Sequence, residues 1–193
     1  MSSPVPQPEA AGRDLRWGDR RLSGATVWLT GLSGSGKSTI AGALALRLLE
    51  QGRAGYVLDA DNLRLGLNQD LDFSESGRRE NVRRVGEVAK LLADAGLVAI
   101  VPIISPYQSA RAEVRATHQA AGLPFLEVHV AATLETCETR DPKGLYRRAR
   151  AGEFTGMTGI DSPYEEPESP DLRIDENVDL HHAVALIVGR LGE

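Results

Sequence analysis

The apolar residues of this chain form two kinds of segment, short continuous runs and longer stretches with helical spacing. Short runs rich in β-branched residues are typical of strands in a parallel sheet that is covered on both faces. The pattern predicts five strands, at residues 25–30, 54–59, 97–104, 124–132 and 171–175. The second of them, AGYVLD, is expected to be a buried strand like the first.

Helical spacing is clearest in residues 38–51 and 75–96, and a glycine closes each segment. Further helices are predicted near residues 107–121, over TLETCETR and KGLYRRARAG, and over HHAVALIVGRL. Strands that alternate with helices predict an α/β fold, with a doubly wound, mostly parallel five-stranded sheet and helices on both faces.

The length of 193 residues favours a single domain, which we place at residues 21–193. Residues 1–20 are rich in Pro, Ala and Ser and lack the apolar core of a secretion signal, so a flexible, loosely ordered tail is expected. Residues 152–170 form a Gly/Pro/Glu-rich loop. A loop of that length is more often functional than a plain connection, so we expect a lid.

Composition narrows the classes of function. The net charge of −5 disfavours nucleic-acid binding, which needs a basic face. No apolar run reaches the roughly 18 residues that a membrane span needs. Cys137 is the only cysteine, which excludes an intramolecular disulfide and fits a reducing compartment. We therefore expect a cytoplasmic protein that binds neither nucleic acid nor membrane.

The segment GLSGSGKS matches the phosphate-binding motif GxxxxGK[ST] and lies between a predicted strand and a predicted helix. Its backbone N–H groups and the helix N-terminus would attract phosphate oxygens. Lys37 is expected to reach the β- and γ-phosphates of ATP, and the Ser38 hydroxyl to ligate Mg²⁺. The residues predicted to bind ATP here are Gly31, Leu32, Ser33, Gly34, Ser35, Gly36, Lys37, Ser38 and Thr39.

The acidic residues expected beside the phosphates follow the second strand, in LDADNLRLGL. The third strand ends in Ile-Ser-Pro, without the aspartate of motor-type ATPases, and no guanine-specificity motif follows a later strand. Ligands bind at the carboxyl ends of strands in open α/β sheets, so Asp59 and Asp61 should face the γ-phosphate. Asp59 would support Mg²⁺ and Asp61 would orient or deprotonate an acceptor hydroxyl, although Asp61 could also cap a helix. A small-molecule kinase fits best.

Several side chains near this point suit an anionic acceptor. Arg64, Arg78 and Lys143 are candidates for gripping anionic groups. Phe73 lies in a polar loop that offers little core, so stacking on a base is at least as reasonable as a packing role. Asn81 lies on the same side of the first helical turn as Arg78.

The chain resembles the adenylyl-sulfate kinases, which use MgATP to phosphorylate the 3′-hydroxyl of adenosine 5′-phosphosulfate (APS). The resemblance is carried, in the family's order, by WLTGLSGSGKSTIA, LDADNLRLGLNQDLDFS, RRENVRRVGEVAKLLADAG, IISPY, DPKGLYRRARAGE and TGIDSPYEEP. It implies a P-loop NTPase fold and formation of 3′-phosphoadenosine 5′-phosphosulfate (PAPS) in sulfate assimilation. It also implies a homodimer and a functional link to ATP sulfurylase.

The resemblance assigns roles to single residues. Asp61 is implied to lie nearest the acceptor 3′-hydroxyl, and Arg140 to cover the adenine of ATP. Ser105 corresponds to a serine reported as a phosphoenzyme site in some relatives. The residues implied to bind the acceptor are Asp61, Asn62, Leu63, Arg64, Phe73, Arg78, Asn81, Ile104, Ser105, Lys143, Gly156 and Met157.

One departure from the family affects the acceptor site directly. The family commonly has a phenylalanine directly before TGID, where it forms an adenine clamp with the residue matching Phe73. Here that position is Met157, while Phe154 lies three residues earlier. Methionine can pack on a ring through its polarizable sulfur, or Phe154 can fold in; the sequence leaves both open. DADN, GRREN and SPYQ also depart from the family's usual words.

Two other functions stay open. One is a small P-loop kinase that acts on another hydroxyl, such as that of a sugar acid or an antibiotic. The other is a catalytically weak nucleotide-binding subunit that serves a partner such as a sulfurylase. Intact Lys37, Ser38 and Asp61 argue against the second.

Overall fold

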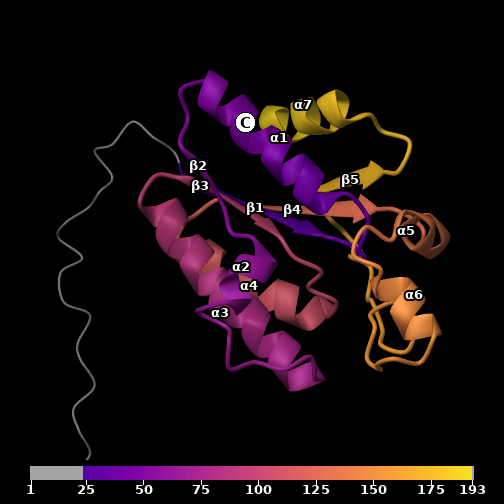
Figure 1. Cartoon of the computed structure of the whole chain (residues 1–193). Coiled ribbons are helices and arrows are strands. Elements are labelled where there is room, and N and C mark those ends of the chain that lie inside the picture. Colours follow the sequence, from indigo (N-terminus) through magenta and orange to yellow (C-terminus); the bar gives the residue numbers. More distant parts are fainter. Residues whose placement is uncertain (1–23, 193) are drawn as a thin grey trace, which may run out of the picture.

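The computed structural model describes residues 24–192, in which five parallel strands form one sheet in the order β2-β3-β1-β4-β5 (Figure 1). The strands are β1 (Ala25–Thr30), β2 (Gly55–Val57), β3 (Val98–Pro102), β4 (Phe125–Ala131) and β5 (Leu172–Asp175). The predicted α/β fold and its five strands are confirmed, and the sheet is wholly parallel. The tail predicted at residues 1–20 lies outside the described residues.

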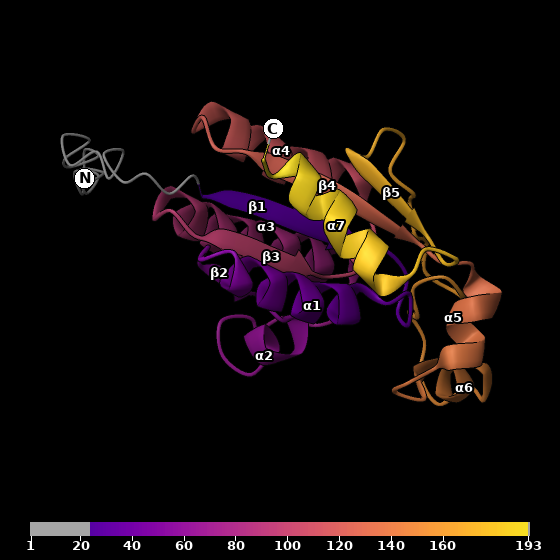
Figure 2. The same ribbon diagram turned by 90° about the horizontal axis from the view of Figure 1, so that it is seen from above.

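Four long helices cover the two faces of the sheet (Figures 1 and 2). One face carries α1 (Lys37–Glu50) and α7 (Leu180–Arg190), and the other carries α3 (Glu75–Asp94) and α4 (Gln108–Ala120). The short helices α5 (Leu134–Arg140) and α6 (Leu145–Arg150) lie beyond the carboxyl ends of the strands (Figure 2). All six of these helices were predicted. None of the helices within residues 24–192 is long and apolar enough to cross a membrane.

The central strand β1 is buried on both faces, which explains why its sequence is apolar at nearly every position. Val27 and Leu29 pack with residues of α1 and α7, and Trp28 between them packs with residues of α3 and α4. Successive side chains of a strand point to opposite faces, so a covered strand needs apolar residues on both. The resulting two cores hold the carboxyl ends of the strands at one edge.

The second strand is not buried as predicted. Strand β2 pairs only with β3 at the edge of the sheet, and its Gly55 and Tyr56 are exposed. Its last residue, Val57, is half-buried, and Leu58, which follows the strand, is buried. A short apolar run does not distinguish a central strand from an edge strand, because tertiary contacts decide where in the sheet the strand lies.

A short helix that was not predicted follows β2, and its cap differs from the expected one. Helix α2 (Ala60–Arg64) begins at Asp59, whose Oδ1 accepts hydrogen bonds from the backbone N–H groups of Asp61 (3.1 Å) and Asn62 (3.0 Å). The capping role considered for Asp61 therefore belongs to Asp59. This leaves the Asp61 carboxylate available for other contacts.

The close approach of α3 and α4 gives a test of the packing. A Cβ at Gly86 would lie 2.7 and 2.9 Å from the two γ-carbons of Val114, a residue that is stiff about χ1. We expect Gly86→Ala to lower the free energy of unfolding in urea by about 1–2 kcal/mol. At Gly42 in α1 an added Cβ meets nothing within 4 Å, so Gly42→Ala is the control and should raise it by up to ~1 kcal/mol. Equal effects would contradict the close approach.

Candidate active site

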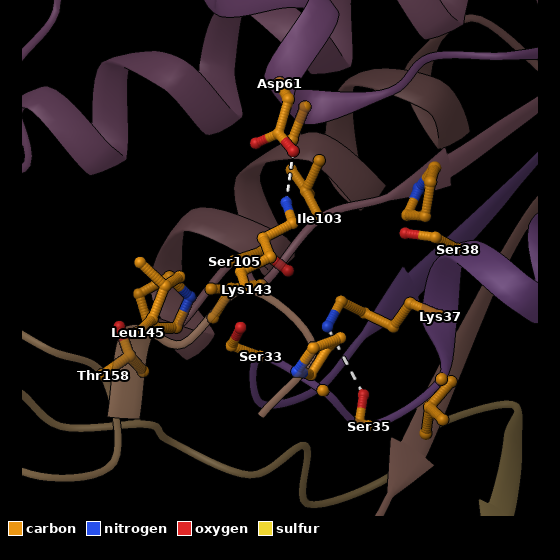
Figure 3. A pocket seen from close by; sticks show the side chains of 18 of the residues that line it. Ser33, Ser35, Lys37, Ser38, Asp61, Ile103, Ser105, Lys143, Leu145 and Thr158 are labelled. Atoms are coloured by element: carbon orange, nitrogen blue, oxygen red, sulfur yellow. Dashed lines mark hydrogen bonds and ion pairs between the residues drawn. The ribbon is translucent and has the colours of Figure 1, made fainter. Parts of the chain in front are cut away.

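A large cavity of about 1250 Å³ opens at the carboxyl ends of the strands. Residues at or after the ends of all five strands contribute to its lining. This volume exceeds the roughly 300–1,000 Å³ of pockets that hold one drug-sized ligand. Figure 3 shows that side chains from the glycine-rich loop and from the α2 region face each other across it. The cavity has room for two nucleotide-sized molecules.

The glycine-rich loop after β1 has the backbone that phosphate binding requires. Gly34 and Gly36 adopt positive φ values of 77° and 106°, and Gly36 is the N-cap of α1. A Cβ at Gly34 would also lie 3.1 Å from the Cys137 carbonyl oxygen of α5. Only glycine adopts such conformations without strain, so the loop can direct its N–H groups into the cavity.

Lys37 lies inside this loop rather than in solvent. Its ammonium donates to the carbonyl oxygens of Gly31 (3.0 Å) and Leu32 (2.7 Å) and to Ser35 Oγ (3.4 Å; Figure 3). The pKa of Lys37 is lowered to about 8, chiefly by burial; Cys137 acts to raise it and nearby Lys143 acts to lower it. A charged lysine at this position would gain from an anionic ligand.

Two oxygen donors in the cavity fit a magnesium ion. Ser38 is exposed at the first turn of α1, and its side chain faces the cavity in Figure 3. Asp59 lines the same cavity and uses Oδ1 for the α2 cap, with Oδ2 in no such bond. Residues 24–192 contain no group of three or more His, Cys, Asp and Glu side chains suited to a metal. Mg²⁺ is usually held by one or two protein oxygens together with substrate phosphates, which this donor set matches.

Opposite the loop, Asp61 forms an ion pair with Lys143, which lies between α5 and α6 (Figure 3). Both residues were predicted at the site, but their pairing was not. Both side chains are more than half exposed and both line the cavity. In this arrangement the Asp61 carboxylate can accept a proton, and the Lys143 ammonium can bind an anion.

The turn after β3 supplies Ile104 and Ser105 to the cavity. Ser105 has a φ of 42°, a left-handed conformation that is costly for a residue other than glycine. It is only 3% exposed, and its Oγ accepts a hydrogen bond from Trp28 Nε1 at 3.1 Å. Thr30 Oγ1 donates to the Ile104 carbonyl at 2.7 Å. Contacts from β1 thus hold this turn in place.

Arg64, Phe73 and Arg78 gather on one side of the cavity. The Arg64 guanidinium lies 4.2 Å above the centre of the Phe73 ring, which is 67% exposed. Arg78 Nε donates to the Phe73 carbonyl at 2.8 Å, and its other nitrogens donate to the Gly156 carbonyl and the Thr158 hydroxyl. Arg78 therefore joins the Phe73 loop to the predicted lid.

Most of the remaining predicted residues also reach the cavity. Asn81 lines it and accepts a hydrogen bond from Asn68 Nδ2 at 3.0 Å. Arg140 lies over the glycine-rich loop, with Nη1 3.5 Å from the Gly34 and Ser35 carbonyls. Four predicted residues lie outside the lining, namely Gly31, Leu32, Asn62 and Leu63. Lys37 contacts the first two through their carbonyls, and Leu63 packs against the core.

Met157 and Phe154 both line the cavity but differ in exposure. Met157 is 6% exposed and packs in a small cluster with Cys137 and Tyr146. Phe154 is half-buried beside this cluster, with the Arg148 guanidinium 5.6 Å from its ring centre. The aromatic ring three residues before Met157 therefore reaches the same cavity.

Two residues that support the site were missed from the sequence. Tyr146 donates its hydroxyl to the Ser33 carbonyl at 3.0 Å and so braces the glycine-rich loop from α6. Arg111 is buried in α4 and donates to the Ser105 carbonyl at 2.7 Å. Tyr146 acts on a segment 113 positions away, whereas Arg111 lies only six residues after Ser105, and no local motif marks either contact.

Comparisons with known proteins agree with this geometry. A sequence profile described as adenylylsulphate kinase matches residues 23–175. The adenylyl-sulfate kinase of Geotalea uraniireducens is 51% identical over 189 residues, covering 92% of this chain and 90% of that protein. The solved structure of the Mycobacterium tuberculosis APS kinase CysC in complex with AMPPNP and APS has 51% identity and a TM-score of 0.87, and the match covers 89% of this chain and 99% of that one.

A third relative is a longer protein. The bifunctional enzyme CysN/CysC of Mycobacterium tuberculosis is 56% identical over 163 residues, which cover 83% of this chain and 26% of that protein. The profile match and the full-length relatives lead to one conclusion. This chain belongs to the adenylylsulphate kinase family.

Proposed function

We propose that this protein, an adenylyl-sulfate kinase by family, transfers the γ-phosphate of ATP to the 3′-hydroxyl of APS and yields ADP and PAPS. The observation that carries the proposal is the ion pair of Asp61 and Lys143 at the cavity that also contains the phosphate loop. Phosphoryl transfer needs an aligned hydroxyl and neutralised phosphate charge. Asp61 can align the hydroxyl on one side of the cavity, and the phosphate loop with Lys37 can neutralise charge on the other.

The phosphate loop binds ATP. Its N–H groups and Lys37 hold the β- and γ-phosphates, and Arg140 lies where it can cover the adenine. Ser38 and Asp59 would hold Mg²⁺, which supplies charge neutralisation at the phosphates when bound. Lys37 exchanges its bonds to the loop carbonyls for bonds to phosphate oxygens.

The acceptor lies on the other side. Asp61 orients the 3′-hydroxyl and accepts its proton, while Lys143 and Arg64 bind anionic groups of APS. Arg78, Asn81, Ile104, Ser105 and Gly156 complete this half. In-line transfer from ATP to the hydroxyl needs no phosphoenzyme, so phosphorylation of Ser105 stays a prediction.

The adenine of APS stacks on Phe73, and we assign the opposite face of the clamp to Phe154. Met157 instead belongs to the packed cluster that supports Phe154, because the Met157 side chain is nearly buried against Cys137 and Tyr146. The loop 152–170 contains no helix or strand beyond one isolated bridge, between Thr158 and Ser162. It acts as a lid that closes over APS and excludes water.

Three wider features complete the proposal. The protein acts as a homodimer, as the family resemblance implies. It works with ATP sulfurylase. A link to a second enzyme is supported by the bifunctional relative, of which the matched region is 26%. The single cysteine, which cannot form an intramolecular disulfide, supports a cytoplasmic location.

The reaction is tested with purified protein, MgATP and APS, followed by anion-exchange chromatography of the nucleotides. Adenosine monophosphate is the control acceptor. A 3′-phosphorylated product that appears only with APS is the expected result. ADP release without that product would instead favour a kinase for another hydroxyl, which is the main alternative.

Asp61→Asn should lower kcat by at least about 100-fold, because the amide cannot accept the hydroxyl proton. The Kd of AMPPNP should change less than about threefold, since Asp61 contacts no residue of the phosphate loop. Asp70→Asn is the matched control, because Asp70 pairs with Arg84 outside the cavity and should leave kcat unchanged. A wild-type kcat in Asp61→Asn would remove Asp61 from the mechanism.

Nucleotide binding should take up protons at alkaline pH. With a pKa of about 8, Lys37 is mostly neutral at about pH 8.5, and bound phosphates favour its charged form. Calorimetry of AMPPNP binding in buffers of different ionisation enthalpy should show uptake of about three-quarters of a proton at about pH 8.5 and little at about pH 7. Lys37→Arg stays charged and should abolish this uptake. The same uptake in both proteins would assign it to another group.

The clamp assignment predicts different effects at two neighbouring positions. Phe154→Leu should raise the KM for APS by about 5- to 20-fold, because base stacking on a ring is lost. Met157→Leu conserves volume and should change it less than about twofold. The KM for ATP should stay constant in both variants. The reverse order of effects would place Met157, not Phe154, against the adenine.

A further inference from the structure

A buried arginine outside the cavity lining connects three separate parts of the molecule. Arg111 lies on α4 and is 2% exposed. Its Nε donates to Glu127 Oε1 of β4 at 2.8 Å, and Nη1 donates to the Ser105 carbonyl at 2.7 Å. Nη2 donates to the Glu165 carbonyl, in the lid segment, at 2.8 Å. One guanidinium therefore holds a strand, the turn after β3 and the second half of the lid segment.

The Ser105 turn needs contacts that stabilise its backbone conformation. A left-handed backbone at a serine costs on the order of 1–3 kcal/mol and persists only where surrounding contacts over-determine it. Trp28 fixes the hydroxyl of Ser105, and Arg111 fixes its carbonyl. Arg111 thus helps to set the conformation of a turn whose Ile104 and Ser105 face the cavity.

The second segment, around Glu165, is docked on the same turn. The Glu165 N–H donates to the Pro106 carbonyl at 2.8 Å, and the Gln108 N–H donates to Glu165 Oε2 at 2.6 Å. Tyr107, the N-cap of α4, makes no side-chain cap bond, so the Glu165 carboxylate caps this helix from the lid segment. Arg111 adds the third bond, through the Glu165 carbonyl.

Charge pairing alone does not account for this arrangement. The Arg111 charge is balanced by Glu127, whose other oxygen receives Arg115 Nη2 at 3.2 Å, and Arg115 also pairs with Asp171 at 2.6 Å. Arg115 makes no bond to either the Ser105 turn or the Glu165 segment. Only Arg111 directs its remaining nitrogens to them, and the planar fork of arginine suits three acceptors in different directions.

We propose that Arg111 is a positioning residue for the acceptor half of the site, because it fixes the Ser105 turn and the Glu165 segment of the lid relative to each other. The inference rests on the proposed function, in which this turn and this lid contact APS. Arg111 itself touches no substrate and acts through Ser105 and Glu165. Its bonds reach no residue of the phosphate loop, so ATP binding should not depend on it.

The kinetic test compares Arg111→Lys with Arg115→Lys. Both variants keep a charge beside Glu127, but only the first loses bonds to the Ser105 and Glu165 carbonyls. Arg111→Lys should raise the KM for APS or lower kcat by about tenfold or more, since small misplacements have effects of that size. The KM for ATP should stay within about twofold, and Arg115→Lys should match the wild type in all three constants. Equal changes in the two variants, or equal changes in both KM values, would overturn the proposal.

A second measurement separates positioning from stability and from the reaction itself. Hydrogen exchange of the protein without nucleotide should be faster in peptides containing Gln108 and Glu165 for Arg111→Lys, and unchanged there for Arg115→Lys. If APS proves not to be the acceptor, this readout still tests the coupling, and unchanged exchange in Arg111→Lys would refute it.

A double variant covers the case in which Arg111→Lys is poorly folded. Arg111→Met with Glu127→Leu removes both members of the buried pair at similar volume. It is expected to fold, because Arg115 keeps Asp171 as its partner and the double change leaves no buried charge unpaired. Its thermal midpoint should lie near that of Arg115→Lys, while the raised KM for APS or lowered kcat should persist. Recovery of wild-type kinetics with recovered stability would show a purely structural role.

Discussion

The functional geometry of this protein depends on the parallel direction of its five strands. Strand β1 is buried on both faces, so helices cover both faces of the sheet. Each connection between parallel strands carries the chain back to the end of the sheet where the strands begin. All five carboxyl ends therefore meet at the opposite edge, where the chain leaves the sheet in loops that need not pack. The phosphate loop, the α2 region and the Ser105 turn are brought together there from distant parts of the sequence.

At that edge the cations of the site are paired with protein oxygens. Lys37 is held by loop carbonyls, Lys143 by Asp61 and Arg78 by the backbone of residues 73 and 156. These pairs keep several positive groups close together, and the lowered pKa of Lys37 shows the cost of burial at one of them. Substrate phosphates and sulfate would replace the neutral carbonyl acceptors of Lys37 and Arg78 with charged ones, which strengthens those bonds.

Much of this architecture could be predicted because its signals are local. The phosphate motif, the helices and the central strands each follow from short patterns. The structure confirms the helices and strands, and the motif lies between β1 and α1 as expected. Errors arose where tertiary contacts decide. AGYVLD reads as a buried strand but forms an edge. The cap of α2 is a local contact, and there the Asp59 carboxylate, not that of Asp61, reaches the free N–H groups. The pairing of Asp61 with Lys143 joins residues 82 positions apart, which no local pattern encodes.

The two halves of the cavity are built by different means, and this affects how each tolerates change. The phosphate loop is one continuous segment whose backbone depends on glycines at positive φ, so a substitution at Gly34 or Gly36 would strain it. The acceptor half is assembled from five segments, and several side chains connect them, Arg78 and Arg111 among them. A change at one contact, such as Met157 in place of an aromatic residue, leaves the other ties intact, and a neighbouring ring such as Phe154 can reach the same cavity.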